Sequence, residues 1–474
     1  MTAGLDIHEV RNKNIALAIS LAILTFNYTD SQVLALVLQN IKSDLGLSDT
    51  QLGFLSGIGF AIFYATMGIP IARLADRGNR VTIISVTTAL WSVFVVTCGA
   101  ARSFVQLFLI RIGVAVGEAG CIPPAQSLLS DFFPRAERAR AFAIYSLGLP
   151  LSVILGGFAA GWINQYYGWR ATFIILGCPG IPLAILARAM LHEPRRTGAS
   201  RPLVIDSPGR RPTSAEVQGS TRALAGSGQT HSFRDVARAL AGNRTFRHLL
   251  IGNTLLYFFV FGAIQWQPTF FIRTHGLSTG EMGTWELLAW AVLGTVGTYG
   301  MGSIVHRFMA RDERRQLHLM SLSIAVFGGV TILLYLAAHR YVALGLLVLS
   351  APFYTGIFGP LFAINQSIVP ESMRATAVAL LLFFANLIGM GLGSFATGLL
   401  SDMLTPVYGS NSLRYSLLSL SPGFFWCAMH FWFASNTVAA DIERAYREKA
   451  PNVVADGIRP TMVNVRAPSP QSPG

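Results

Sequence analysis

The stretch FFPRAERARAFAI, residues 132–144, returns in altered form as SIVPESMRATAVAL, residues 367–380. Both copies place a proline four residues before an Arg-Ala pair, so that Pro134 precedes Arg138 and Pro370 precedes Arg374. An apolar, glycine-rich run follows each copy, at residues 148–161 and 389–398. Similar segments at a wide separation predict a chain that is built from two related halves.

The composition indicates which solvent surrounds these halves. The chain has 474 residues, of which 52% are hydrophobic and only 12% are charged, whereas soluble domains carry about 25% charged residues. A helix needs about 20 mostly apolar residues to cross a bilayer. Runs that meet this length begin near Ile15, Gln51, Thr82, Phe104, Ala139, Trp169, Phe246, Gly280, Leu317, Tyr341, Ala375 and Leu413. The sequence therefore predicts an all-α membrane protein with twelve transmembrane helices in two pseudo-symmetric six-helix bundles.

The apolar runs divide the chain into five parts. We expect an N-terminal tail at 1–14, a first bundle at 15–192, a linker at 193–245, a second bundle at 246–440 and a C-terminal tail at 441–474. The linker is rich in Arg, Ser, Pro and Gly, a composition that buries too little apolar surface to order itself fully. Within it, a short helix is expected around Phe233–Leu240.

Basic residues gather in alternate connections, including residues 73–80, 135–140, the linker and residues 307–315. Because cytoplasmic loops retain Lys and Arg, both termini and the linker are predicted to be cytoplasmic in a multi-pass protein of the cell membrane. The net charge of +13 is thus explained by topology, and no nucleic-acid partner is expected. We also expect no metal, no other cofactor and a monomer. The four cysteines lie in apolar runs without metal-ligand spacing.

Three ionisable residues fall inside apolar runs, where charges are costly and often line a pathway. Asp30 lies roughly 22 Å along the first helix, and Arg111 roughly 10 Å along the fourth helix, which enters from the other side. These depths match in a hydrocarbon core about 30 Å thick, so Asp30 and Arg111 can pair. Glu118 follows Arg111 by about two turns and shares its face.

This trio suggests proton handling. An unpaired carboxylate is unfavourable in hydrocarbon, which suits Glu118 to carrying a proton. We predict that Asp30 and Glu118 compete for Arg111, so that protonating one frees the other. The alternative is a static network that fixes the first helix against the fourth.

The second half offers mainly neutral polar groups for a substrate cavity. They stand beside phenylalanines such as Phe258, Phe259, Phe383 and Phe384, which would make the cavity amphiphilic. Glu286 is a weaker candidate for a pathway residue. The polar candidates are Gln265, Trp266, Gln267, Asn365, Gln366 and Asn386.

The chain resembles the major facilitator superfamily over nearly its whole length. The segment ARLADRGNR, residues 72–80, is similar to that family's signature between helices 2 and 3. The resemblance implies a cytoplasmic gate in which Asp76 contacts the end of helix 11 and nearby arginines. Its expected members are Asp76, Arg77, Arg80, Arg138 and Arg374. The matching loop of the second half carries His306 where the acidic residue would stand.

The first half is similar, more narrowly, to the Spinster-like branch and its bacterial relatives. The strings that carry the likeness are FNYTDSQ (26–32), LGLSDTQLGFLSG (45–57) and RIGVAVGEAGCIPPAQSLLSDFFP (111–134). Ser31 stands where these relatives usually have arginine, so no role of that arginine carries over. The likeness implies proton-coupled export of a lysolipid, sphingoid lipid or other amphiphile by alternating access. Proton symport of a small organic anion that Arg111 holds remains the alternative.

Other classes of membrane protein find less support. A membrane enzyme would show a metal, nucleotide or acidic motif, and the sequence has no HExxH, Walker or paired Asp-rich segment. It therefore predicts no catalytic residues, and a polytopic enzyme is the distant alternative. A channel would show a pore loop or charged rings, and neither is evident.

Overall fold

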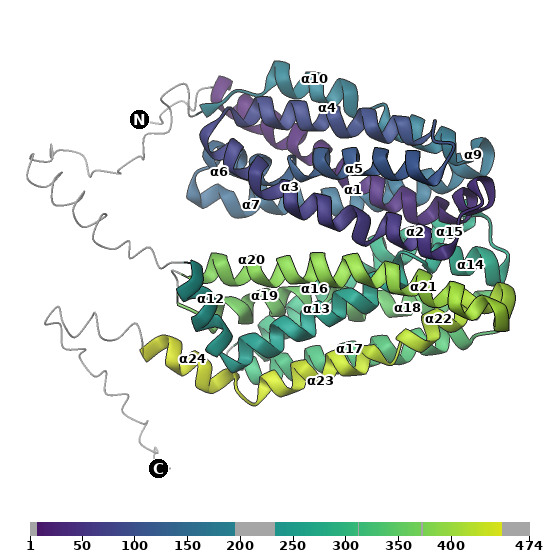
Figure 1. Ribbon diagram of the computed structural model, residues 1–474. Coiled ribbons are helices and arrows are strands. Elements are labelled where there is room, and N and C mark those ends of the chain that lie inside the picture. Colours follow the sequence, from purple (N-terminus) through teal and green to yellow (C-terminus); the bar gives the residue numbers. More distant parts are fainter. Residues whose placement is uncertain (1–6, 195–232, 311, 371–372, 448–474) are drawn as a thin grey trace, which may run out of the picture.

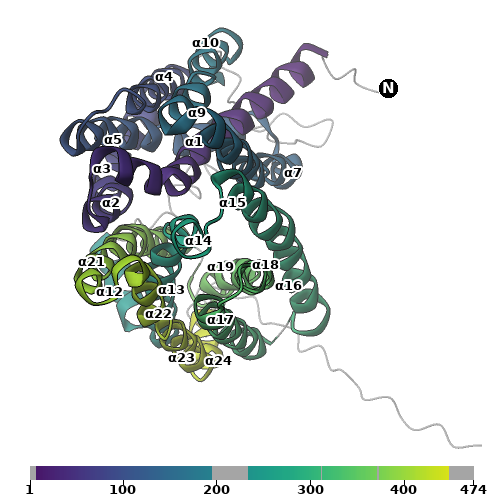
Figure 2. The ribbon, with the colours of Figure 1, turned by 90° about the vertical axis from the view of Figure 1, so that its right-hand side faces the viewer.

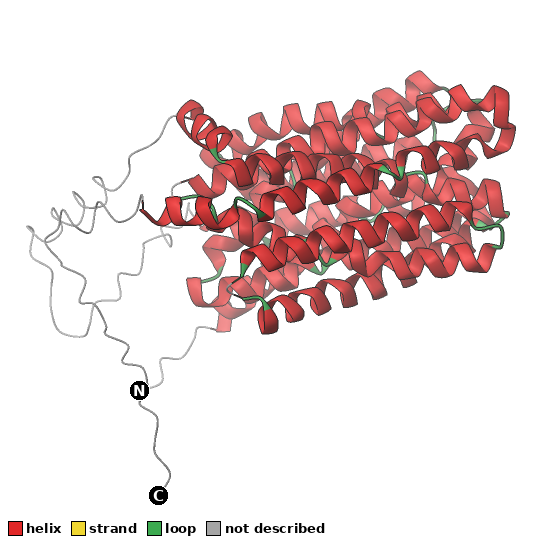
Figure 3. Cartoon of the chain, turned by 90° about the horizontal axis from the view of Figure 1, so that it is seen from below, coloured by secondary structure: helices red, strands yellow, loops and turns green. Residues whose placement is uncertain are grey.

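The computed structural model describes residues 7–194, 233–310, 312–370 and 373–447. Within these ranges the chain forms helices joined by short turns and no strand (Figure 3). The helices run roughly parallel to one long axis, as expected for segments that cross a membrane together.

The first half consists of six crossings, several of which are built from consecutive helical pieces. They are α1 (Ile7–Leu45); α2 (Asp49–Ser56) with α3 (Ile58–Arg77); α4 (Arg80–Cys98); α5 (Phe104–Ala119) with α6 (Ile122–Phe132); α7 (Arg135–Ser146), α8 (Gly148–Val153), the π-helical η1 (Ile154–Ala159) and the start of α9 (Ala160–Gly177); and the rest of α9 with α10 (Gly180–Met190).

The second half repeats this plan after a short helix, α12 (Phe233–Gly242). Its crossings are α13 (Arg244–Ile264) with α14 (Gln267–His275); α15 (Thr279–Glu286), the π-helical η3 (Leu287–Leu293) and α16 (Gly294–Phe308); α17 (Glu313–Leu336); α18 (Arg340–Thr355) with α19 (Phe358–Ser367); α20 (Arg374–Phe384), the π-helical η5 (Ala385–Met390) and α21 (Gly391–Tyr408); and, after η6 (Gly409–Asn411), α22 (Ser412–Leu420) with α23 (Gly423–Ser435). α24 (Val438–Arg447) ends the described chain.

The predicted number of crossings is confirmed. Ten segments of the described chain are long and apolar enough to span a membrane, and two of them, Arg140–Met190 and Thr376–Ser435, have 51 and 60 residues. A crossing needs about 20 residues, so each of these two holds a pair. Gly168 (φ 78°) and Gly409 (φ 55°) divide them, because a turn in the left-handed region favours a residue without Cβ.

The internal repeat extends to the turns. Gly46 (φ 64°) and Gly276 (φ 65°) follow the first and seventh crossings. After each glycine comes Leu-Ser, and the serine, Ser48 or Ser278, closes a capping box on the next helix. The positive-φ glycines of the described chain thus fall at two pairs of corresponding turns, as a duplicated six-helix plan requires.

The halves lie side by side, with α1–α10 above and α12–α24 below in Figure 1. The face where α1 begins and α24 ends is called the tail face, and the face of the four glycine turns is called the far face. Toward the far face, α2 packs on α21, and α15 packs on α9. In the end-on view, α14 and α15 lie between the two lobes (Figure 2).

The ends of the bundles differ from the expected boundaries. α1 begins at Ile7, inside the expected tail, and α24 continues to Arg447, past the expected end at 440. Asp441 on α24 accepts a hydrogen bond from the backbone N–H of Thr245 at the start of α13, at 2.9 Å. α24 is therefore tied to the second bundle by a helix cap. α12 covers the helix expected in the linker, and linker residues 195–232 lie outside the described residues.

Candidate functional site

Asp30 and Arg111 form an ion pair inside the first half. Asp30 comes from α1 and Arg111 from α5, and both side chains are buried. Nη1 of Arg111 donates to Oδ2 of Asp30, and the guanidinium lies over the ring of Phe60, 5.1 Å from its centroid. The pairing predicted from helix depth is confirmed, because two buried opposite charges are far more stable together than apart.

The pair does not satisfy all of its polar atoms. Oδ1 of Asp30 and Nε of Arg111 are buried and have no hydrogen-bond partner among the described residues, and the same holds for Oε1 of Glu118. Each buried polar atom without a partner costs about 1–3 kcal/mol. Three such atoms on neighbouring ionisable groups mark a place that can exchange a proton or receive a polar ligand.

Glu118 lies beside a break in its crossing helix. α5 ends at Ala119 and α6 starts at Ile122, followed by Pro123 and Pro124. The prolines have no N–H, so the carbonyls one turn earlier, those of Ala119 and Gly120, lose their helical donors. Discontinuous helices of this kind occur at the binding sites of transport proteins.

Tyrosines extend this site toward the second half. Tyr28 on α1 and Tyr64 on α3 lie close enough to Glu118 to interact with its carboxyl electrostatically. Tyr257 on α13 lies near Tyr28, so the phenol groups reach from one bundle to the other. Sequence reasoning missed them, although Tyr28 stands only two residues before Asp30 in an apolar helix.

Some of the predicted cavity residues are available for polar contacts. Asn365 and Gln267 are buried, and both side-chain amide atoms of Asn365 and Oε1 of Gln267 have no hydrogen-bond partner among the described residues. Gln265 is half-buried and Gln366 is exposed. These four side chains can still take part in binding.

Two other predicted cavity residues are engaged in packing. Trp266 is 0% exposed, and its Nε1 donates to the carbonyl of Ser394 on α21 at 2.9 Å. Nδ2 of Asn386 donates to the carbonyl of Leu382, one turn earlier in its own helix, at 2.9 Å. In this conformation Trp266 fills the contact between α14 and α21, and its place in the substrate cavity stays a prediction.

Arg80 pairs with side chains of its own half. Its buried guanidinium contacts Asp131 at 2.7 Å and Ser127 at 3.0 Å, and it forms an ion pair with Glu193. All three partners belong to the first half, so Arg80 holds the start of α4 against α6 and the end of α10. The cytoplasmic gate that was expected to include Arg77 and Arg80 stays a prediction, and Arg77 is exposed.

The remaining predicted gate residues lie near their own loops. Nε of Arg138 donates to the carbonyl of Phe133, and Nε of Arg374 donates to the carbonyl of Gln366, each at 3.0 Å. These bonds are local to the two loops of the repeat that opens the sequence. The side chain of Asp76 lies outside the described residues.

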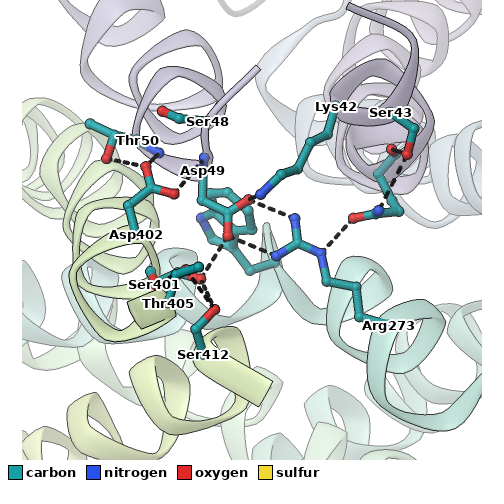
Figure 4. Close-up of polar contacts among 12 residues, drawn as sticks. Lys42, Ser43, Ser48, Asp49, Thr50, Arg273, Ser401, Asp402, Thr405 and Ser412 are labelled. Atoms are coloured by element: carbon teal, nitrogen blue, oxygen red, sulfur yellow. Dashed lines mark hydrogen bonds and ion pairs between the residues drawn. The ribbon is translucent and has the colours of Figure 1, made fainter. Parts of the chain in front are cut away.

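At the far face the halves are joined by a cluster that sequence reasoning missed (Figure 4). Arg273 of α14 donates to both oxygens of Asp49 of α2, at 2.7 and 2.6 Å. Lys42 and Ser401 also donate to Asp49, each at 2.6 Å. Asp402 accepts from the backbone N–H groups of Asp49 and Thr50, at 3.0 and 2.7 Å. We call these contacts of Asp49 and Thr50 with α14 and α21 the charged clasp.

The repeat supplies a second contact of the same design, which we call the neutral clasp. Here α15 takes the place of α2, and α9 takes the place of α21. Nδ2 of Asn164 donates to Thr279 Oγ1 at 3.1 Å, and Gln165 accepts from the N–H of Gly280 at 3.2 Å. Asn164 and Gln165 thus correspond to Ser401 and Asp402 of the charged clasp, with one amide in place of a hydroxyl and the other in place of a carboxylate.

Close backbone contacts accompany both clasps. A Cβ on Gly398 would lie 2.2 Å from the carbonyl oxygen of Asp49, and a Cβ on Gly161 would lie 2.4 Å from that of Thr279. Small residues allow transmembrane helices to approach this closely. The far face is therefore closed by two corresponding contacts between the bundles.

Comparisons with known proteins agree with this architecture. Residues 20–394 match the family model of the Major Facilitator Superfamily. An MFS-type efflux pump of Mycolicibacterium smegmatis is 30% identical over 438 residues, which cover 92% of this chain and 96% of the pump. A hexuronate transporter of Bacillus subtilis is 25% identical over 390 residues, covering 79% of this chain and 85% of that protein.

Solved structures give the same result. A bacterial homologue of the human lysosomal transporter Spinster, in an inward-facing and unoccupied conformation, superposes with a TM-score of 0.76 at 28% identity, covering 91% of this chain and 98% of that chain. A D-xylose–proton symporter shares the fold, with a TM-score of 0.62 at 15% identity, covering 88% and 96%. The chain is therefore a member of the Major Facilitator Superfamily that resembles the Spinster-like branch, a multi-pass secondary transporter of a small molecule and not an enzyme.

Proposed function

We propose that this transporter is proton-coupled and exports a lipid-like or amphiphilic small molecule from the tail face, which is cytoplasmic, to the far face. The observation that carries the proposal is the buried group of Asp30, Arg111 and Glu118, each with an unsatisfied polar atom. One chain supplies both bundles and both clasps, which supports action as a monomer.

The proton step is an exchange of partners. Arg111 now pairs with Asp30, and Glu118 lies two turns further along the same helix. A proton that binds Asp30 weakens this pair, because a neutral carboxyl attracts a guanidinium less strongly. Arg111 can then turn to Glu118, and loss of the proton from Asp30 reverses the change.

Movement of the substrate follows by alternating access. The two clasps hold the far face closed, and the likeness to an inward-facing structure supports access from the tail face in this conformation. Opening the far face requires the ion pair of Asp49 with Arg273 to separate. Rocking of two similar halves about a central site is the usual way in which such repeats transport.

The class of substrate is inferred from the setting of the site. The tyrosines that lead from Glu118 to Tyr257 combine apolar rings with hydroxyl groups, which suits a ligand with a long apolar part and a polar end. The efflux pump of M. smegmatis supports outward transport of the substrate.

A small organic anion is the second candidate, taken up together with a proton. Nε of Arg111 has no partner among the described residues, and a guanidinium is well suited to binding a carboxylate. The similarity to a hexuronate transporter supports this alternative.

The test uses the purified protein in liposomes with a pH-sensitive dye inside. Lysolipids, sphingoid bases and hexuronates are added in turn to wild type, Asp30→Asn, Glu118→Gln and the control Glu281→Gln. Glu281 is an exposed acid, so its variant should behave as wild type. We expect proton flux that depends on an amphiphile and is lost in Asp30→Asn and Glu118→Gln. Flux driven by hexuronate alone would favour the second candidate, and substrate movement without proton flux would reject the coupling.

A further inference from the structure

A second buried carboxyl lies between the halves, outside the site of Asp30, Arg111 and Glu118. Glu286 is the last residue of α15, directly before the π-helical η3, and it is 5% exposed. It faces Gly157 in the π-helical η1 of the first half: a Cβ built on Gly157 would lie 3.5 Å from Oε2 of Glu286. The carboxyl is therefore enclosed by an interface between two π segments, which are frequent at functional positions of helices.

Glu286 has no compensating partner among the described residues. It forms neither a hydrogen bond nor an ion pair, and no neighbouring charge acts on it. η1 and η3 carry no titratable side chain. The titratable groups with described side chains on α15 and on the other helices that pack against it are Glu281 on α15; Lys13, Tyr28, Asp30, Lys42 and Asp44 on α1; Tyr166, Tyr167 and Arg170 on α9; Arg273 and His275 on α14; and Arg340, Tyr341 and Tyr354 on α18.

The internal repeat shows that this arrangement is unusual within the molecule itself. Glu286 follows Thr279 by seven residues, as Ser56 follows Asp49, and Gly157 precedes Gly161 by four, as Ser394 precedes Gly398. Beside the charged clasp, the hydroxyls of Ser56 and Ser394 hydrogen-bond across the halves at 2.8 Å. At the corresponding place beside the neutral clasp, the carboxyl of Glu286 faces Gly157. The chain thus places an ionisable group where its other half has a satisfied neutral pair.

We propose that Glu286 is a second proton-binding site, which takes up a proton from water at the far face as the clasps close and returns it when they open. The proposal rests on the alternating access proposed above. Glu286 is enclosed because α9 and η1 of the first half pack on α15 and η3 of the second half. This packing is lost when the far face opens. A carboxylate without a partner is strongly disfavoured there, whereas its neutral form is tolerated.

Proton uptake on closing fixes the direction of the pH effect. Where the open form is ionised and the closed form is protonated, the ratio of closed to open molecules falls by about tenfold for each unit rise in pH. The carboxylates of the charged clasp act in the opposite direction, because protonating Asp49 weakens its pair with Arg273. The sign of the pH dependence therefore separates Glu286 from the clasp.

The experiment measures the distance across the far face without substrate or proton gradient. Spin labels are placed at Tyr167→Cys in α9 and Tyr341→Cys in α18, both exposed positions in opposite halves, with the exposed Cys178 replaced by Ser. Asp49→Asn serves as the background, because it removes the clasp carboxylate and populates the open form. We expect the short-distance population to decline steadily as the pH rises from about 5 to 9.

Two variants and one control identify the residue. Glu286→Gln should remain closed over the whole pH range, and the control Glu281→Gln should keep the pH dependence. The double variant Glu286→Ser/Gly157→Ser copies the pair of Ser56 and Ser394, and it should also close independently of pH. This double variant therefore replaces Glu286→Gln as the test if Glu286→Gln folds poorly.

The outcomes separate this proposal from the proposed function. Two results would overturn the proton site. One is a label distance that does not change with pH in Asp49→Asn with the native Glu286, and the other is a pH dependence that survives Glu286→Gln. Absence of substrate-driven proton flux in liposomes would overturn proton-coupled export while leaving a pH-dependent distance intact.

Discussion

Asp49 and Arg273 join the two halves through two parallel hydrogen bonds of 2.7 and 2.6 Å. The carboxylate is almost fully buried, and only about a tenth of the Arg273 side chain is exposed. A bidentate pair of this kind is stronger and more directional than a single contact. The energy of far-face opening therefore depends on separating two specific charges.

Replacing Asp49 should open the far face. In Asp49→Asn the guanidinium of Arg273 loses its counter-charge, and removal of one partner from a buried pair costs about 3–5 kcal/mol. The loss falls on the closed conformation, because Arg273 reaches water when the halves part. Spin labels at Tyr167→Cys and Tyr341→Cys should show a larger long-distance population than the same labels in the Asp49 protein at the same pH.

Lys42→Gln is the matched control for this clasp. Lys42 also contacts Asp49, at 2.6 Å, but it belongs to the same half, so its contact can persist when the halves separate. The distance distribution should stay close to that of wild type. An equal opening in Lys42→Gln, which leaves the pair of Asp49 with Arg273 in place, would contradict the assignment of far-face closure to that pair.

A methyl group at Gly283 should prevent tight closure. A Cβ there would lie 2.3 Å from the carbonyl oxygen of Gly157, and overpacking of this kind costs about 1–3 kcal/mol. Gly283→Ala should therefore favour the open far face and slow substrate transport. Gly300→Ala, in the same crossing and with no atom within 4 Å of the new Cβ, should transport as wild type does. Impaired transport in both would point to a general effect of alanine in this helix.

The exchange of partners at Arg111 can be tested by stability alone. Asp30→Asn removes the counter-charge of Arg111, but Glu118 can take its place and limit the loss. The double variant Asp30→Asn/Glu118→Gln leaves Arg111 with neither carboxylate, so it should unfold at a clearly lower temperature than Asp30→Asn in detergent. Equal unfolding temperatures would mean that Glu118 does not reach Arg111.

Arg80 should matter for stability and not for closure of the far face. Arg80→Gln breaks a buried ion pair with Glu193 and a second pair with the exposed Asp131. Breaking the buried pair costs about 3–5 kcal/mol and should lower the unfolding temperature. Because these partners lie in one half, the far-face distance should not change. An unchanged unfolding temperature in Arg80→Gln would show that these ion pairs do not hold the first half together.

The buried pair could be predicted from sequence because the depth of a residue in the membrane can be calculated from its position in the helix. Helix rise and bilayer thickness placed Asp30 and Arg111 at one depth, and few other charges lay in the apolar runs. The pairing in the charged clasp could not be predicted from depth in this way. Asp49 and Arg273 stand at the ends of apolar runs, where charges usually contact water, and their pairing depends on how the bundles approach each other.

Trp266 shows a second limit of the sequence. Its place between Gln265 and Gln267 suggested a polar wall, but side-chain direction changes sharply where α13 gives way to α14. The ring of Trp266 turns toward Gly398, whose Cβ would lie 2.9 Å from it, and the glycine makes the room. A single sequence does not reveal which distant glycine accommodates a given aromatic ring.

The first turn of α2 is completed from outside its own half. Ser48 accepts the N–H of Gln51, while the N–H groups of Asp49 and Thr50 are held by Asp402. Whenever the bundles part, those two amides lose their acceptor and meet solvent. The hydrogens of these two amides should therefore exchange with deuterated water when the far face opens. Their exchange rate would report how often the native, unlabelled chain opens.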